Sequence, residues 1–138
     1  MSFGISIGDF IAIGQLVFKV YRRAKESSEQ YKAASTDLAG MHMVVKDITE
    51  TVIEKNLSPD KKVQLELLCT SCRDILEDFD AMMTKYESLG FKSRRTWDRL
   101  RYDQGRVKEL RDRMGVSIGL LNSFNLSLSR LVIISGRS

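Results

Sequence analysis

The chain has 138 residues, of which 43% are hydrophobic and 29% are charged, and its formal net charge is +4. This length and composition are typical of one globular domain over residues 1–138, and they exclude a disordered tail and an integral membrane protein. One Pro and nine Gly are too few for a chain of many short strands, so we expect long helices.

The first helix is expected over residues 6–25. Ser6 and Asp9 have the spacing of a capping box, and the basic residues at the end suit the negative pole of the helix dipole. Apolar residues cover more than half of its circumference, which is wider than the stripe of an ordinary surface helix. Residues 3–20 would measure ~27 Å as a helix, close to the ~30 Å of a bilayer core, although Asp9, Gln15 and Lys19 oppose insertion.

Two interpretations of this first helix stay open. It is either a buried central helix of the fold or a helix that leaves the core and enters a membrane. In the second case a set of apolar residues would insert, namely Phe3, Ile5, Ile7, Phe10, Ile11, Ile13, Leu16 and Val17. A glutamate at Ile5 or Ile13, on the face that we expect to be least needed for packing, would test the second interpretation.

The remaining helices are marked by apolar residues whose spacing alternates between three and four. Residues 28–55 and residues 59–89 form two such series, and Pro59 stands at the first helical position of the second. A short helix is expected near residues 97–102, and the alternating series resumes over residues 104–134. These seams and the short polar connections predict an all-α fold, an antiparallel bundle of four long helices plus one short helix.

Cys69 and Cys72 have the Cys-x-x-Cys spacing of redox motifs and of half a zinc site. They fall in the middle of an expected helix, and His42 alone does not complete a zinc site, so we interpret them as small buried or half-buried side chains. Replacing both should abolish no metal-dependent function. We expect no metal and no cofactor. With a single His and no catalytic motif we also expect no enzyme, and two cysteines suit a reducing, cytoplasmic compartment.

The stretch over residues 92–113 carries nine basic and four acidic residues, a net charge of +5. It is either a solvated helix face with local pairs such as Arg95–Asp98 and Lys108–Asp112, or a surface for anionic lipids or an acidic partner. Binding to nucleic acid is the third and least favoured interpretation. The residues expected to bind lipid or an acidic partner are Lys92, Arg94, Arg95, Arg99 and Arg101.

Gly115 and Gly119 form a Gly-x-x-x-Gly pair in the last expected helix. Glycine weakens a helix interior by ~1 kcal/mol relative to alanine, so we expect the pair to have a role in packing. We interpret it as a place where another helix of the bundle crosses closely.

Two segments of the chain have a distinctive pattern. They read Phe3-Gly4-x-x-x-Gly8-Asp9-Phe10-Ile11-Ala12 and Trp97-Asp98-Arg99-Leu100-x-Tyr102-Asp103-Gln104, and the second continues through Glu109-Leu110-Arg111 to Leu120-Leu121-Asn122-Ser123-Phe124. Together with the order and length of the expected helices, these residues resemble the fungal HeLo-like domain, the N-terminal domain of many fungal STAND (NLR-like) proteins.

This resemblance implies an effector or signalling domain placed before NLR-type domains, in the same or a partner chain. Its role would lie in innate immunity, programmed cell death or heterokaryon incompatibility. Related HeLo domains, the necroptosis-type four-helix bundle and plant coiled-coil NLR domains imply a homo-oligomer that exposes its N-terminal helix and permeabilises anionic membranes. The chain would then be cytoplasmic and would move to the plasma membrane on activation.

The alternative is a soluble helical adaptor bundle that binds other helical proteins and never enters lipid. No nucleotide-binding motif is visible in the sequence. We therefore expect either a fragment of a larger NLR-like protein or a bundle that acts alone.

Overall fold

The computed structural model describes residues 7–53, 57–88 and 94–137. Within these ranges the side chains of residue 7, residues 94–103 and residues 131–137 are not described. The helices are α1 (Ile7–Lys25), α2 (Glu29–Lys32), α3 (Ser35–Ile53), α4 (Pro59–Ser88) and α5 (Arg94–Arg137). The described residues contain no strand, so the predicted all-α class is confirmed.

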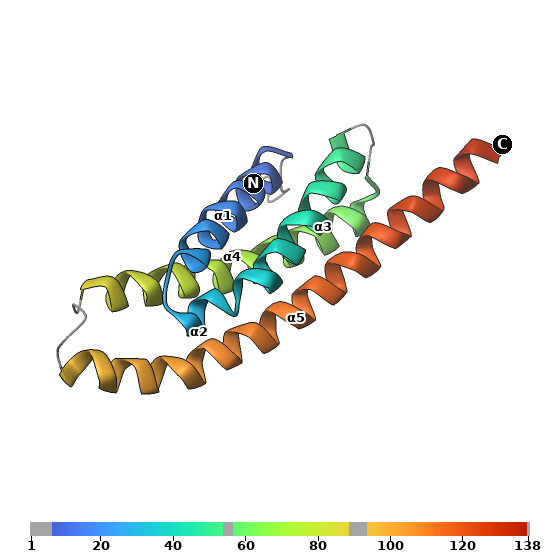
Figure 1. The fold of residues 1–138 in the computed structure, drawn as a ribbon. Coiled ribbons are helices and arrows are strands. Elements are labelled where there is room, and N and C mark those ends of the chain that lie inside the picture. Colours follow the sequence, from blue (N-terminus) through green and yellow to red (C-terminus); the bar gives the residue numbers. More distant parts are fainter. Residues whose placement is uncertain (1–6, 54–56, 89–93, 138) are drawn as a thin grey trace.

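Figure 1 shows the arrangement of the four longer helices, which run in alternating directions along the chain. α1 packs against α3 and α4, and α5 packs against the same two helices. α5 is the longest helix, and its C-terminal end extends past the other helices (Figure 1). α1 and α5 therefore stand at opposite corners of the assembly.

The predicted seams are confirmed wherever their side chains are described, because every such residue is buried. From α2 through the turn to α3 they are Tyr31, Ala34, Leu38, Met41, Val45, Ile48 and Val52. In α4 they are Leu65, Leu68, Cys72, Ile75, Phe79, Met82 and Tyr86, and in α5 they are Val107, Leu110, Met114, Ser117, Leu121, Phe124 and Leu128. Burial of this continuous apolar surface is the main contribution to the stability of the fold.

The helix predicted over residues 28–55 is interrupted in the structure. α2 ends at Lys32 and α3 begins at Ser35, whose hydroxyl donates a hydrogen bond of 2.6 Å to the carbonyl of Lys32. The amide of Ala34 bonds back three residues to Tyr31, which tightens the chain at this point. The apolar spacing continues unchanged across the break, so the seam alone gave no sign of it.

The separate short helix predicted near residues 97–102 is wrong. The described backbone is helical without interruption from Arg94 to Arg137, and the short helix of this fold is α2. Gly105 lies within α5, where it is exposed and has open space around it. A single glycine with helical backbone weakens a helix without ending it.

Candidate functional site

α1 is attached to the bundle by one apolar stripe. Its buried residues are Phe10, Ile13, Val17, Val20 and Ala24, spaced by three or four like the other seams. Leu16 and Tyr21 are partly buried against the same core. Because this stripe faces α3 and α4, the two helices form the seat of α1.

The exposed side of α1 carries apolar residues among polar ones such as Gln15 and Lys19. Ile11 is 39% exposed and Phe18 is 45% exposed. The Phe18 ring lies 5.4 Å from the His42 ring between centroids, and the Arg22 guanidinium lies 5.9 Å from the centroid of Phe18. The interpretation of α1 as a surrounded central helix is therefore wrong, and burial does not explain its wide apolar arc.

The residues expected to enter a membrane differ in their burial. Phe10, Ile13 and Val17 are buried in the seat, Leu16 is partly buried, and Ile11 is exposed. Ile7 begins α1, but its side chain is not described, and Phe3 and Ile5 lie outside the described residues.

Ile13 was expected to lie on the face least needed for packing, and this expectation is wrong. Its side chain is 2% exposed and belongs to the buried stripe. A charge at this position would be removed from water in the folded chain and would destabilise the bundle. Ile11 is the described α1 residue that offers the intended test, because it adds to the apolar arc without filling the seat.

Arg23 joins the end of α1 to α4 through a polar cluster. Its guanidinium donates to the carboxylate of Asp80, to the carboxylate of Glu87 at 3.1 Å and to the hydroxyl of Thr84 at 3.2 Å. Lys19 lies 3.9 Å from the other carboxylate oxygen of Asp80. The Arg23 and Asp80 side chains are each about one quarter exposed, so water screens the pair only in part. We call this set the Arg23 cluster.

Sequence reasoning did not identify the acceptors of the Arg23 cluster. The basic residues at the end of α1 were assigned to the helix dipole. Asp80, Thr84 and Glu87 are spaced by four and three along α4, which places them on one side of that helix. This spacing is a signal that the sequence contained.

The basic stretch begins α5 and does not form an element of its own. Lys92 lies outside the described residues, and the side chains of Arg94, Arg95, Arg99 and Arg101 are not described. Their expected contacts with lipid or an acidic partner therefore stay predictions.

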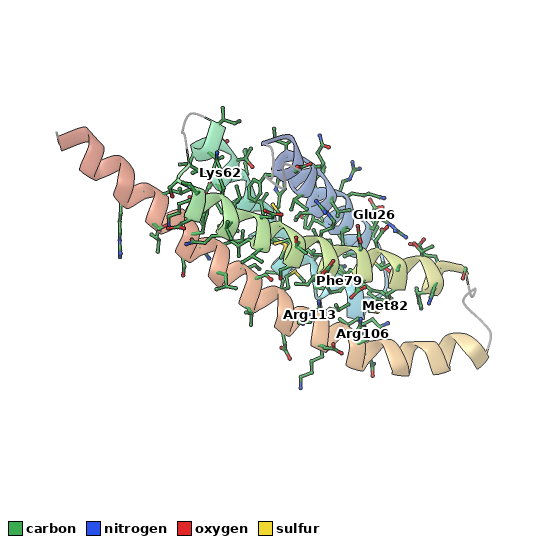
Figure 2. The ribbon with its side chains drawn as sticks, turned by 180° about the vertical axis from the view of Figure 1, so that it is seen from behind. Glu26, Lys62, Phe79, Met82, Arg106 and Arg113 are labelled. Atoms are coloured by element: carbon green, nitrogen blue, oxygen red, sulfur yellow. The ribbon has the colours of Figure 1, made fainter. Side chains whose placement is uncertain are left out.

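The described half of the basic stretch forms ion pairs, mostly between helices. Arg106 lies 3.1 Å from Asp78 and 2.9 Å from Glu109, and Arg113 lies 3.5 Å from Asp78. Figure 2 shows Arg106 and Arg113 on α5, beside α4. Arg111 lies 2.7 Å from Asp37 of α3. These basic residues hold α5 against its neighbours, and the expected Lys108–Asp112 pair is not among the salt bridges of the described part.

Cys69 and Cys72 both face the core of the bundle. Each is about 1% exposed, and burial raises the pKa of Cys69 to about 12 and that of Cys72 to about 11. Thiols that stay protonated are poor nucleophiles and poor metal ligands. Among the described residues no group of three or more potential metal ligands is present.

The raised thiol pKa values predict a loss of stability at high pH. The ordinary value is 9.0, so above pH 9 the unfolded chain releases thiol protons that the folded chain retains. The free energy of unfolding should therefore be unaffected by these groups below pH 9 and should fall as the pH rises toward 11. Urea titrations check this, and the fall should be smaller in a Cys69→Ala, Cys72→Ala variant. An equal fall in both proteins would contradict it.

Gly115 and Gly119 do not mark a crossing of bundle helices. Both are exposed, and a Cβ atom built on either meets nothing within 4 Å in the described part of the protein. Our interpretation of the pair as a close contact inside the bundle is therefore wrong.

No protein-family model matches this chain, and comparisons with curated proteins and with solved structures find no match. Among the helices that the structure describes, none has the length and apolar character needed to cross a bilayer. The function must therefore be inferred from the residues of α1, its seat and the Arg23 cluster.

Proposed function

We propose that this chain is an effector domain that perturbs membranes through α1 after this helix leaves its seat. The observation that carries the proposal is that α1 packs mainly on α3 and α4, with an apolar stripe in that contact, exposed apolar residues beside it and the Arg23 cluster at its end. Such a helix can be exchanged between the bundle and another apolar environment.

The arrangement of the other helices supports this exchange. α5 packs against both α3 and α4, so these three helices keep a shared core when α1 is absent. α1 stands at the corner opposite α5, and its departure breaks no contact between the remaining long helices. The main energetic cost of release is then the loss of the contacts made by the apolar stripe and the Arg23 cluster.

A released α1 would have the character of a helix that lies in a membrane interface. Its buried stripe and the exposed Ile11 and Phe18 would join into one broad apolar face. The basic residues of its last two turns would meet anionic headgroups; they are Lys19, Arg22, Arg23 and Lys25. Apolar area combined with Lys and Arg is the pattern of amphipathic helices that bind at membrane surfaces.

The wider assignment follows the resemblance to the fungal HeLo-like domain. We propose a non-enzymatic antiparallel bundle of four long helices and one short helix that oligomerises and serves NLR-type domains in immune or cell-death signalling. It would be cytoplasmic at rest and would act on anionic lipids of the plasma membrane when activated.

A soluble adaptor bundle is the second candidate. It is favoured by a groove between α4 and α5, where Leu67, Leu120 and Phe124 form an apolar surface that a helix of another protein could contact. Release of a trapped dye from anionic vesicles separates the two candidates. Leakage caused by the purified chain supports the effector, whereas binding of helical proteins without leakage supports the adaptor.

The basic start of α5 provides a further prediction. If it meets anionic lipid, reversing Arg94, Arg95, Arg99 and Arg101 to glutamate should weaken binding to anionic vesicles at least tenfold, because each basic residue contributes ~1 kcal/mol near such a surface. Added salt should weaken binding of the parent chain in the same direction. Sedimentation with vesicles measures both effects. Equal binding to neutral and anionic vesicles would remove this stretch from the mechanism.

A further inference from the structure

The exposed side of α5 carries a second seam, opposite the one that faces the core. Its residues are again spaced alternately by four and three, and all of them are exposed. They are Asp112, Val116, Gly119, Ser123, Leu126 and Arg130. Because an alternating spacing keeps residues in line along a helix, these six form one continuous stripe, which we call the outer seam.

The outer seam has the composition of an interface. No charged residue occurs from residue 114 to residue 129, a length of ~24 Å of helix, although 29% of the chain is charged. Val116 is 65% exposed and Leu126 is 62% exposed. Of the nine large apolar side chains exposed in the described part of the chain, five belong to α4 and α5. An exposed helix face in a monomer is normally polar.

We propose that the outer seam pairs in antiparallel orientation with the same seam of a second copy of this chain. With the two-fold axis near Leu121, Asp112 lies opposite Arg130 of the partner subunit, and the same ion pair repeats at the other end. Within the described residues neither Asp112 nor Arg130 takes part in a salt bridge, so both charges are available.

The middle of the outer seam fits the same register. Val116 lies opposite Leu126 of the partner subunit, and Gly119 lies opposite Ser123 of the partner subunit. A bare glycine and a serine at the centre let the two helix backbones approach closely, while the apolar pairs on either side exclude water. The open space outside Gly115 and Gly119 is then occupied by the second helix.

The charges at the two ends of the outer seam indicate which partner it binds and in which direction the partner helix runs. A parallel pair would place aspartate on aspartate and arginine on arginine, which repel, whereas the antiparallel pair places opposite charges together at both ends. Two copies of the outer seam therefore match when one of them runs in the opposite direction. A two-fold symmetric interface requires this match. A second copy of the chain meets that requirement without further assumptions.

The contact is expected to be weak. One helix pair is smaller than the ~1,600 Å² of a standard interface, so the dimer should dissociate on dilution. α1 stands at the opposite corner, so pairing does not depend on its release. The inference deepens the oligomerisation in the proposed function and is tested without membranes, so that failure of either one leaves the other intact.

Sedimentation equilibrium of the purified chain over a wide concentration range tests the proposal. The parent should show a monomer–dimer equilibrium, and Leu126→Glu should weaken it at least tenfold by placing a charge in the apolar part of the contact. Leu126 is exposed, so the variant should keep the circular dichroism of the parent. Met43→Glu is the matched control, because Met43 is 68% exposed on α3 and lies outside the outer seam.

Charge reversal tests the register. Asp112→Arg alone and Arg130→Asp alone should each weaken the dimer, and the double variant should restore it because the pairs are re-formed in reverse. A parent chain that is monomeric at every concentration would overturn the proposal. A dimer unchanged by Leu126→Glu, or a double variant no stronger than the single ones, would overturn it equally.

Discussion

Replacing Ile11 with glutamate is expected to leave the bundle folded and to reduce vesicle leakage more than tenfold. Ile11 is 39% exposed on the outer face of α1, so the carboxylate stays in water while the helix is seated. At the membrane interface the carboxylate would replace a buried isoleucine side chain, whose full burial is worth about 1.5–3 kcal/mol, and anionic headgroups would repel it, which is enough for the expected loss. Circular dichroism measures the fold, and dye release measures the activity.

Ile13→Glu provides the contrasting variant. Ile13 is buried in the seat, and an unpaired buried charge costs several kcal/mol, so this variant should be largely unfolded. Met43→Glu, on α3, should fold and leak like the parent. If folded Ile11→Glu permeabilises vesicles as well as the parent, α1 has only a packing role and the adaptor function replaces the proposal.

Replacing Arg23 with glutamate is expected to have the opposite effect on activity. The variant removes a charged donor and places a third carboxylate beside Asp80 and Glu87, so the end of α1 is repelled from α4. We expect about 1–3 kcal/mol lower stability and about tenfold faster leakage, because α1 leaves its seat more often. Thermal melts and dye-release rates measure the two effects.

Two variants control for the change in net charge. Lys62→Glu makes the same change on an exposed residue of α4 that forms no salt bridge in the described part of the chain, and it should leave leakage unchanged. Arg23→Glu combined with Asp80→Arg restores an attractive pair and should return leakage toward the parent rate. Slower leakage from folded Arg23→Glu would show that the cluster does not hold α1 in place.

Much of the fold could be predicted because apolar spacing reports burial directly. The seams of residues 28–55, 59–89 and 104–134 predicted which residues form the core, and each of their described side chains is buried. The break at Ala33 and Ala34 was missed because both alanines favour a helix, and the seam continues across them. Tertiary packing at that point outweighs local propensity.

Less of the candidate site was predictable, because a seam does not specify which helices are neighbours. The wide apolar arc of α1 suggested a surrounded helix, whereas packing on two helices leaves Ile11 and Phe18 exposed. For the same reason Ile13 was predicted on the face of α1 that is least needed for packing, although it is buried in the seat. The partners of Arg23 lie on α4, about sixty residues away in sequence, and such a pairing becomes visible only when the helices are assembled.

The central claim, that α1 must leave its seat, is tested most directly by a reversible lock. A Cβ atom built on Gly14 lies 3.6 Å from Cγ1 of Val45 on α3, so we expect Gly14→Cys and Val45→Cys to form a disulfide across the α1–α3 contact. Cys69→Ala and Cys72→Ala in the same chain prevent other pairings. The two single lock variants serve as controls, since oxidation forms no such bond in them.

Dye release from anionic vesicles is then measured for the lock variant before and after reduction. The account predicts that the oxidised protein releases little dye and that reduction raises the rate at least tenfold, while the single variants leak equally in both states. A fully cross-linked protein that releases dye as fast as its reduced form would contradict the account, because α1 would then act without leaving the bundle.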